Sequence, residues 1–427
     1  MFNQNGLSLD QAPPISVVFR FFFSGALFGI LAGILILFFQ NTIFDAQNIE
    51  AVIVTHTLTL GVMLSFMFAA LFQMLPVIAG VTLTSPVKKA NLVQYPFILW
   101  VFTLLLAFNF SVPWLFSVAS FLLGGALLYI TIIMVKNLWS LPHHSSSSKG
   151  MLSALFSLVI VILLALYLTG TLGGLLEGSY YTQIKTAHYS FGLFGWIALL
   201  ILSISFQVIE MFYVTPSYPR LVSKYLPLTL LTLLVITTMI GLFNPAVWII
   251  SNSLLALLLI GYALLTLKRL TQRKRPLTDA TVWFWRIGLS SLIVSMLTMT
   301  ATLFTEISIL KSLSYLFFAS FALSIVFAMF YKIVPFLTWF HLNSQGYFTA
   351  PMMHEVIHPK TAKKHLYIHL ATIVTFVLSL FVNIFIFLAG LLMILSFSWM
   401  TYQIVHADKL YKETQKNGEK FDMGSMG

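Results

Sequence analysis

Residues 51–79 read AVIVTHTLTLGVMLSFMFAALFQMLPVIA. The run is almost entirely apolar and holds no lysine, arginine, aspartate or glutamate. About 20 such residues are enough for a helix to cross the hydrocarbon core of a bilayer. The apolar residues are continuous and do not alternate with polar ones, as they would in a strand of a membrane barrel. The sequence therefore predicts a membrane-spanning helix at 51–79.

Similar runs occur along the whole chain. The twelve predicted spans are 15–38, 51–79, 92–110, 114–135, 151–175, 184–212, 225–243, 246–267, 282–304, 312–339, 366–382 and 384–405. Of the 427 residues, 59% are hydrophobic and only 8% are charged, whereas soluble domains average about 25% charged residues. We therefore expect an all-α membrane protein with a single membrane domain over residues 1–427, and we exclude soluble enzymes, disordered chains and fibrous repeats. The absence of cysteine excludes thiolate-bound metals and iron–sulfur clusters.

The positive charges indicate how the spans are oriented. With the N-terminus in the cytoplasm, all but Lys185 and Lys311 of the 23 lysines and arginines fall in inner loops or at inner span ends. Cytoplasmic loops of membrane proteins carry this excess. The pattern predicts twelve spans with both termini cytoplasmic, in a cytoplasmic (inner) membrane. The net charge of +11 then indicates orientation and contact with the lipid bilayer, and no nucleic-acid partner.

Polar segments separate the spans into groups of four. The serine-rich segment 143–148 predicts a flexible inner linker, RKRP at 273–276 a second linker, and 406–427 a polar, disordered cytoplasmic tail. The blocks between them extend over about 15–135, 151–267 and 282–405.

The second span of each block ends in a similar way. FQMLP stands at 72–76, FQVIE at 206–210 and YKIVP at 331–335. A histidine near the outer end begins two of these spans, His56 in the first block and His188 in the second. Long apolar helices can resemble one another by chance, but the matching ends, lengths and linkers favour three pseudo-repeated four-helix arcs.

The segment after His56 carries a family resemblance. LPVIAG at 75–80 is followed by Pro86 and Asn91. This order resembles the catalytic subunit of haem-copper oxidases and nitric oxide reductases (cytochrome c oxidase subunit I-like proteins), in which the helix-2 histidine precedes a similar Pro-Leu-x-x-Gly, a proline and an asparagine. Those proteins also have three arcs of four helices. The resemblance covers the chain as architecture and is specific only over about 56–100; the NnrS-type haem-copper membrane proteins are a related comparison.

This resemblance implies a cofactor and a role. It implies haem bound by His56, with His188 as a second ligand, and respiratory electron transfer or nitric oxide handling beside other respiratory or cytochrome subunits. The family holds copper with three histidines of helices 6 and 7 and ligates haem from helix 10. Here Gly192 stands where the family has tyrosine, and the spans 225–243 and 312–339 contain no histidine. The ligands of a complete binuclear oxygen-reducing centre are therefore missing.

A second candidate group is polar and lies near the inner ends of the second spans. Its members occupy matching or adjacent positions: Gln73, Gln207, Glu210 and Lys332. A charge inside a span is costly and usually faces a bundle interior or a cavity. We expect Lys332 to point inward, with Glu210 as its nearest carboxylate at about 4–6 Å. Such a group suits an inner gate or proton path, a packing ion pair, or a lysine that snorkels to the headgroups.

A third signal is the formal HExxH at 354–358. On a helix this spacing binds zinc in metalloproteases, but Pro351 and Pro359 bracket it here. The alternative is a loop packed on the inner face, with His365 and His369 on one face of the following span.

Two function hypotheses remain open at this point. The first is the haem-binding relative described above, for which Thr59, Gly61 and Ser65 after His56 leave room for a planar ligand. The second is a cofactor-free multi-span transporter or channel that uses the pore of the bundle.

Overall fold

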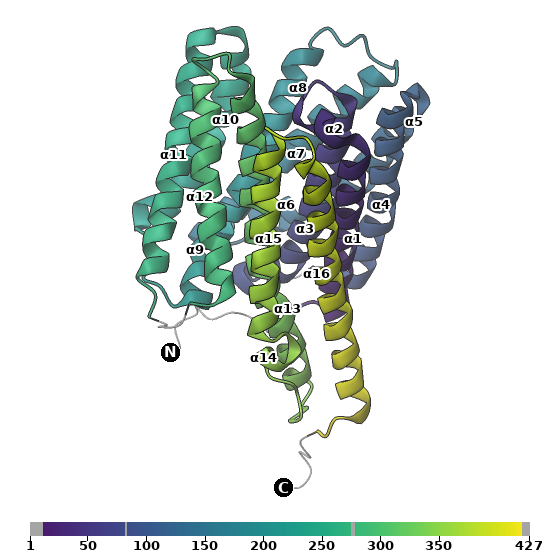
Figure 1. The fold of residues 1–427 in the computed structure, drawn as a ribbon. Helices are drawn as coiled ribbons and strands as arrows, with labels where there is room; N and C mark the ends of the chain where they lie inside the picture. Colours follow the sequence, from purple (N-terminus) through teal and green to yellow (C-terminus); the bar gives the residue numbers. More distant parts are fainter. Residues whose placement is uncertain (1–11, 82, 275–277, 421–427) are drawn as a thin grey trace.

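The computed structural model describes residues 12–81, 83–274 and 278–420, and it is a bundle of long helices that run side by side (Figure 1). In chain order the α-helices are α1 (Ile15–Phe39), α2 (Ile49–His56), α3 (Ser65–Ala79), α4 (Pro86–Phe110), α5 (Pro113–Leu122), α6 (Tyr129–Trp139), α7 (Ser146–Leu172), α8 (Tyr181–Ser190), α9 (Leu199–Tyr213), α10 (Arg220–Met239), α11 (Pro245–Thr271), α12 (Ala280–Ala301), α13 (Ser308–Ser344), α14 (Met353–Val356), α15 (Pro359–Ser379) and α16 (Phe385–Asn417). Among the described residues no strand forms, apart from one isolated bridge between Tyr347 and Lys420.

Helix segments of other types connect some of these elements. Short 3₁₀ turns follow α1 and α10, at Gln40–Phe44 and Gly241–Phe243. Three π-helical segments continue an α-helix without a break, and they are η3 (Thr57–Leu64), η4 (Leu123–Leu128) and η5 (Phe191–Ala198). The continuous rods α2–η3–α3, α5–η4–α6 and α8–η5–α9 correspond to the predicted spans 51–79, 114–135 and 184–212.

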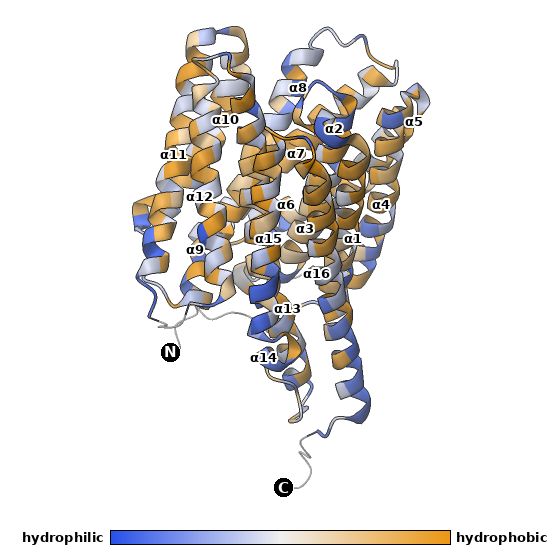
Figure 2. Ribbon diagram, in the orientation of Figure 1, coloured by the Kyte–Doolittle hydropathy of each residue, from blue (hydrophilic) through white to orange (hydrophobic). Residues whose placement is uncertain are grey.

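Eleven helical rods of the described residues are long and apolar enough to cross a membrane. The prediction of a helical multi-pass membrane protein is therefore confirmed. Figure 2 shows the apolar bodies of the helices, with hydrophilic stretches on α14 and on the last turns of α16. Helix α15 is not among the eleven, because Lys363, Lys364, His365 and His369 make its first half polar.

Three rods form the centre of the bundle. The buried share of the most apolar stretch is 78% in Ile49–Val77, 83% in Tyr181–Tyr213 and 61% in Ser308–Ser344, against 35–56% in the other eight. These three are the second spans of the predicted blocks. The less buried helices expose phenylalanine and leucine outward, as lipid-facing helices do.

Two of the central rods share an unusual backbone. Each has an eight-residue π-helical segment, η3 or η5, followed by an α-helix of 15 residues. π-Helix is rare and often occurs at functional sites. His56 immediately precedes η3, and His188 lies in the last turn before η5. The third central rod, α13, is α-helical throughout.

Glycine permits a close helix contact between α1 and α16. A Cβ atom on Gly29 would lie 2.2 Å from the Phe397 ring, and one on Gly33 would lie 2.9 Å from the backbone nitrogen of Ile394. On the opposite side, a Cβ on Gly390 would lie 3.2 Å from the Gly33 carbonyl oxygen. Small residues let helix backbones approach in this way inside membranes. The first long helix therefore packs directly against the last.

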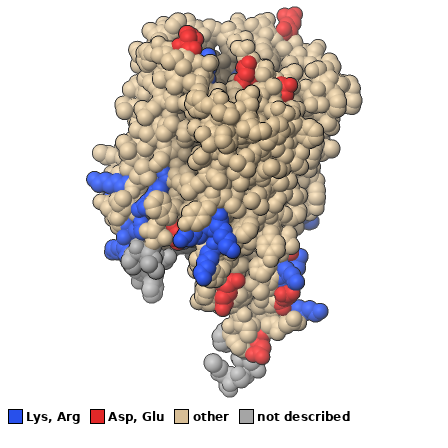
Figure 3. All heavy atoms as spheres, in the orientation of Figure 1, with Lys and Arg blue, Asp and Glu red and all other residues tan. Residues whose placement is uncertain are grey.

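The charged side chains are distributed unevenly along the bundle. Helix α1 begins and α16 ends at the lower end in Figure 1, which we call the terminal end; the opposite end is the far end. On the face drawn in Figure 3, most lysine and arginine side chains gather toward the terminal end, and several carboxylates stand at the far end.

Two predictions about polar segments are wrong. The tail from 406 is helical as far as Asn417, and pairs such as Lys412–Asp408, at 2.6 Å, brace its exposed turns. The prediction of a flexible linker at 143–148 is wrong for its second half, 146–148, which begins α7, because Ser145 caps that helix by accepting a hydrogen bond from the Ser148 N–H at 3.1 Å. Part of the predicted linker at 273–276 and the last residues of the tail lie outside the described residues.

Candidate functional site

His56 and His188 face each other near the far end of the bundle. His56 is the last residue of α2 and His188 lies in α8, so neighbouring central rods supply them. Their ring centroids are 6.3 Å apart, with ring planes inclined by only 14°. The ring of Phe108, from α4, lies 5.4 Å from the His56 ring. The structure thus brings together the two histidines that the sequence singles out.

The hydrogen bonds of this pair determine which nitrogen is free. His56 Nδ1 lies 2.8 Å from the carbonyl oxygen of Val52, and His188 Nδ1 lies 3.3 Å from that of Val161 in α7. A carbonyl oxygen can only accept, so each Nδ1 must carry the hydrogen. Each Nε2 is then an acceptor, and neither is bonded to another described residue. Metal-binding histidines are commonly oriented by such a bond from the opposite nitrogen.

The two histidines have the chemistry to bind haem, but the space beside them is filled by side chains. Two neutral imidazoles with free Nε2 atoms fit the axial ligands of haem iron, and equally the ligands of a single metal ion. The flat space expected beside Gly61 is filled, because a Cβ there would lie 2.5 Å from the Phe28 ring of α1. Ser65 is fully buried and packs near Gly25. These small residues serve helix packing here, so a planar ligand on this side requires the Phe28 ring to move.

The predicted polar group does not form one cluster. Lys332 Nζ lies 2.6 Å from Asp279 Oδ2 and 5.3 Å from the Tyr213 ring centroid. Glu210 instead accepts a hydrogen bond from the Tyr218 N–H at 2.9 Å. The expectation that Glu210 is the nearest carboxylate to Lys332 is therefore wrong.

The other two members of this group, Gln73 and Gln207, are uncharged. Gln207 is partly buried, and Gln73 is only 6% exposed. The Gln73 Oε1 atom has no hydrogen-bond partner among the described residues. A buried acceptor without a partner is uncommon in folded proteins.

Asp279 owes its place to the start of α12. It is the N-cap of that helix and accepts hydrogen bonds from the Val282 N–H at 3.1 Å and the Thr281 hydroxyl at 2.6 Å. Burial alone would raise the pKa of its carboxyl, but the Lys332 ammonium and these hydrogen bonds outweigh burial, and the pKa is lowered from the usual 3.8. An aspartate just before an apolar run is a helix-start signal, but it does not indicate a partner on another helix.

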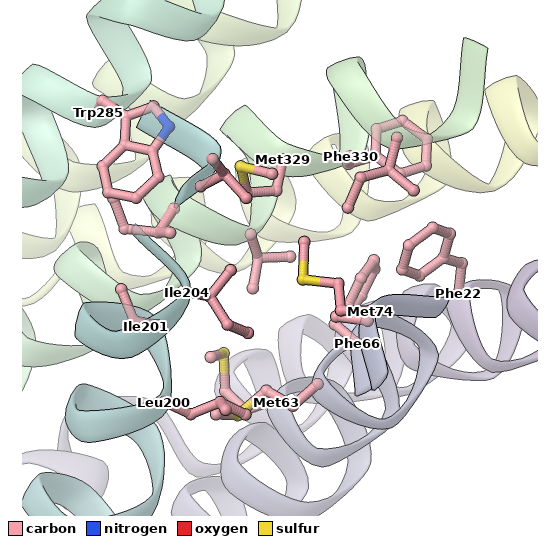
Figure 4. A pocket seen from close by; sticks show the side chains of 16 residues that line it. Phe22, Met63, Phe66, Met74, Leu200, Ile201, Ile204, Trp285, Met329 and Phe330 are labelled. Atoms are coloured by element: carbon pink, nitrogen blue, oxygen red, sulfur yellow. The ribbon is translucent and has the colours of Figure 1, made fainter. Parts of the chain in front are cut away.

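A cavity of about 70 Å³ lies between the three central rods (Figure 4). Met63 and Phe330 line it from the first and third rods, and each rod adds four residues at the same spacing of i, i+1, i+4 and i+8. They are Phe66, Met67, Ala70 and Met74; Leu200, Ile201, Ile204 and Val208; and Ile325, Val326, Met329 and Ile333. Every lining side chain is apolar, with Phe22 of α1 and Trp285 of α12 completing the wall. An apolar cavity of this kind stays dry and accepts small apolar molecules.

Sequence reasoning missed a second buried group, formed by α13, α15 and α16. His365 is fully buried, and its Nδ1 lies 2.9 Å from the Tyr331 hydroxyl and its Nε2 2.6 Å from the Ser396 hydroxyl. One turn later, His369 Nε2 lies 2.7 Å from the Ser324 hydroxyl. The prediction that these histidines share one helix face is correct. Their polarity in a span was the available signal for a buried hydroxyl–imidazole network.

The HExxH segment does not form a zinc helix. Helix α14 ends at Val356, so His354 and His358 do not lie on one continuous helix. His358 accepts a hydrogen bond from the Lys360 N–H at 3.1 Å and caps α15, while Glu355 accepts one from the Met352 N–H at 2.7 Å. Among the described residues, no three histidine, aspartate or glutamate side chains converge as a metal site would require.

Compared with known protein families and with curated proteins, the sequence matches none of them.

Proposed function

We propose that this chain is a divergent relative of the haem-copper oxidase catalytic subunit that binds haem with His56 and His188. Its role is respiratory electron transfer or nitric oxide handling in a cytoplasmic (inner) membrane, beside other respiratory or cytochrome subunits. One observation supports this most directly. Two histidines from adjacent central rods face each other, and backbone carbonyls orient both so that the Nε2 atoms remain free.

The proposed architecture is twelve membrane-spanning helices in three four-helix arcs. The common spacing along the cavity wall and the shared π-segments of two central rods support it. Helix α15 is the remaining span, since its 21 residues, at about 1.5 Å each, match the thickness of the hydrocarbon core. Both ends of the chain then lie on the cytoplasmic side, where the positive charges gather.

The residues of the site have distinct tasks in this proposal. His56 and His188 would hold the cofactor, and the Val52 and Val161 carbonyls fix their orientation and tautomer. Bound haem iron supplies one-electron redox chemistry and an affinity for nitric oxide. Phe108 packs against the His56 ring, and both histidines are half-buried. The ligands for a complete binuclear oxygen-reducing centre are missing from the sequence, so oxygen reduction is not part of the proposal.

The test is an absorption spectrum of the full chain expressed with added haem. We expect a Soret band in the wild type that is lost in His56→Ala and weakened in His188→Ala. His406→Ala, an exposed change on α16, is the control and should keep the band. Equal spectra for wild type and His56→Ala would remove His56 from the site. Iron and copper analysis of the same samples separates haem from a bare metal ion.

A second candidate function is transport without a cofactor through the centre of the bundle. The cavity between the three central rods favours it, and its apolar wall restricts the cargo to small apolar molecules, because an ion there would lose its hydration. Haem-free spectra from wild type and variants alike, together with passage of such a molecule across reconstituted vesicles, would select this function.

A further inference from the structure

An open hollow of about 510 Å³ lies at the terminal end of the bundle, outside the histidine site and the central cavity. The turn after α3, the start of α4 and the last turns of α6 form it. Its polar lining consists of Thr84, Lys89, Tyr129, Lys136, Asn137 and Ser140. Every one of these side chains can donate a hydrogen bond, and no carboxylate is among them.

The positive charge of this hollow is not balanced within the chain. The sequence contains no aspartate or glutamate between Glu50 and Glu177. The ion pairs of the described residues lie elsewhere, and they are Lys332–Asp279, Lys409–Glu413 and Lys412–Asp408. Among the described residues, Lys89 and Lys136 therefore have no carboxylate partner in the hollow. An anion from outside the chain would complete the site.

Lys89 is held in place for such a contact. Its Nζ donates to the Thr84 carbonyl oxygen at 2.6 Å and to the Thr84 hydroxyl at 2.7 Å. An ammonium group has three donors, so one remains for a ligand. Helix α4 begins between these two residues, and its N-cap, Ser85, provides no side-chain hydrogen bond. Pro86 at the first helical position has no N–H, so the free N–H groups of this turn are those of Val87 and Lys88, at the positive end of the helix dipole.

We propose that this hollow binds the phosphate headgroup of an anionic phospholipid. Lysines and a helix N-terminus are the donors that a phosphate prefers. The helix surfaces beside it are apolar and exposed, with Ile132 at 50% and Leu92 at 52%, so acyl chains can lie along α4 and α6 while the phosphate contacts the lysines. A soluble phosphate shares the headgroup chemistry but makes no use of this surface, which favours the lipid.

The experiment measures the unfolding temperature of the full chain in neutral detergent. Three additions are compared: phosphatidylglycerol, phosphatidylcholine and inorganic phosphate. A ligand that binds only the folded state raises the unfolding temperature. We expect phosphatidylglycerol to raise it, phosphatidylcholine to raise it less and inorganic phosphate to leave it unchanged. The variants are Lys136→Gln, Lys89→Gln and the double change, and Lys88→Gln, which does not line the hollow, is the matched control.

Each lysine removed from the hollow should weaken the apparent affinity for phosphatidylglycerol about fivefold. The control should keep the wild-type affinity, and mass spectrometry should find less phosphatidylglycerol copurifying with the double variant. An equal response in the double variant and in Lys88→Gln would overturn the site. A shift with inorganic phosphate as large as that with the lipid would assign the hollow to a soluble phosphate and overturn the lipid.

Discussion

Lys332 Nζ lies 2.6 Å from Asp279 Oδ2, and this contact joins the inside of α13 to the first turn of α12. The lysine side chain is 17% exposed and the aspartate 42%, so the pair is partly screened by solvent. Asp279 therefore has two structural tasks, because it caps α12 and neutralises a cation inside the bundle. Both tasks fix the relative position of the two helices.

Breaking the Lys332–Asp279 pair should lower the free energy of unfolding, because it leaves the partly buried Lys332 ammonium without a counter-charge. Asn is also a good N-cap, so Asp279→Asn removes the charge and keeps the cap. We expect a loss of about 1 kcal/mol, between the values of exposed and buried pairs. The free energy of unfolding of the double variant, Asp279→Asn with Lys332→Met, should fall by less than the sum of the losses in the two single variants. Lys412→Met, which breaks an exposed pair, is the control and should cost less than about 0.5 kcal/mol. If the losses of unfolding free energy in the single variants add up to the loss in the double variant, the contact contributes nothing to stability.

The same pair should make stability depend on acid pH. Folding lowers the pKa of the Asp279 carboxyl below 3.8, so the stabilisation is complete above that value and is lost as the pH falls through the lowered pKa. The unfolding temperature should therefore fall more steeply below about pH 4 in the wild type than in Asp279→Asn. Parallel pH profiles would contradict this.

Gly33→Ala should destabilise the contact between α1 and α16. Its Cβ would lie 2.9 Å from the Ile394 nitrogen and 3.0 Å from the Gly390 oxygen, and neither backbone atom can turn aside. Overpacking of this kind costs about 1–3 kcal/mol. Gly261→Ala is the matched control, since nothing lies within 4 Å of its added Cβ, and helix propensity should make it neutral or stabilising. Similar unfolding temperatures for the two variants would show that the close approach is not required.

Reporter fusions should distinguish eleven membrane crossings from twelve. We expect fusions at Ser146 and Gln272 to be cytoplasmic, and those at Asn41 and Ser179 to be outside. The decisive pair is Asn383, after α15, and Gly418, after α16. If α15 crosses, Asn383 reports outside and Gly418 inside; if it does not, the two readings are reversed.

His365→Phe should be strongly destabilising although it conserves an aromatic ring. The change leaves the Tyr331 and Ser396 hydroxyls without their buried partner, at a cost of about 1–3 kcal/mol for each group. His406→Phe, on an exposed position of α16, is the control and should have little effect. Equal stability of the two variants would mean that the hydroxyls find other partners.

Much of the helical arrangement could be read from the sequence, because hydropathy depends on composition alone. The predicted spans lie within the observed rods to a few residues, and only polar α15 fails as an apolar span by itself. The polar ends were predicted less well. The first turns of α7 and the last turns of α16 contain residues typical of linkers and tails, yet capping and pairs at i, i+4 keep them helical.

The sequence predicted the candidate site only where a distinctive residue type, histidine, marked the positions. His56 and His188 could be chosen as histidines in matching helices, and they do lie together. The partner of Lys332 could not be identified from the sequence. Asp279 lies far from Lys332 along the chain, in a turn between two predicted spans. The filling of the Gly61 space by Phe28 depends on how α1 packs, and a glycine in a sequence does not distinguish room for a ligand from room for a neighbour.

The contact of α1 with α16 has a consequence for how the protein is made. Helices are delivered to the membrane in the order of synthesis, so α1 is inserted before α16, and its glycine face stays in contact with lipid until α16 leaves the ribosome. Until then the face around Gly29 and Gly33 is open to lipid and to other proteins. Closure of this contact is therefore a late event in the assembly of the bundle, and until it happens the glycine face of α1 is open to pairing with a wrong helix.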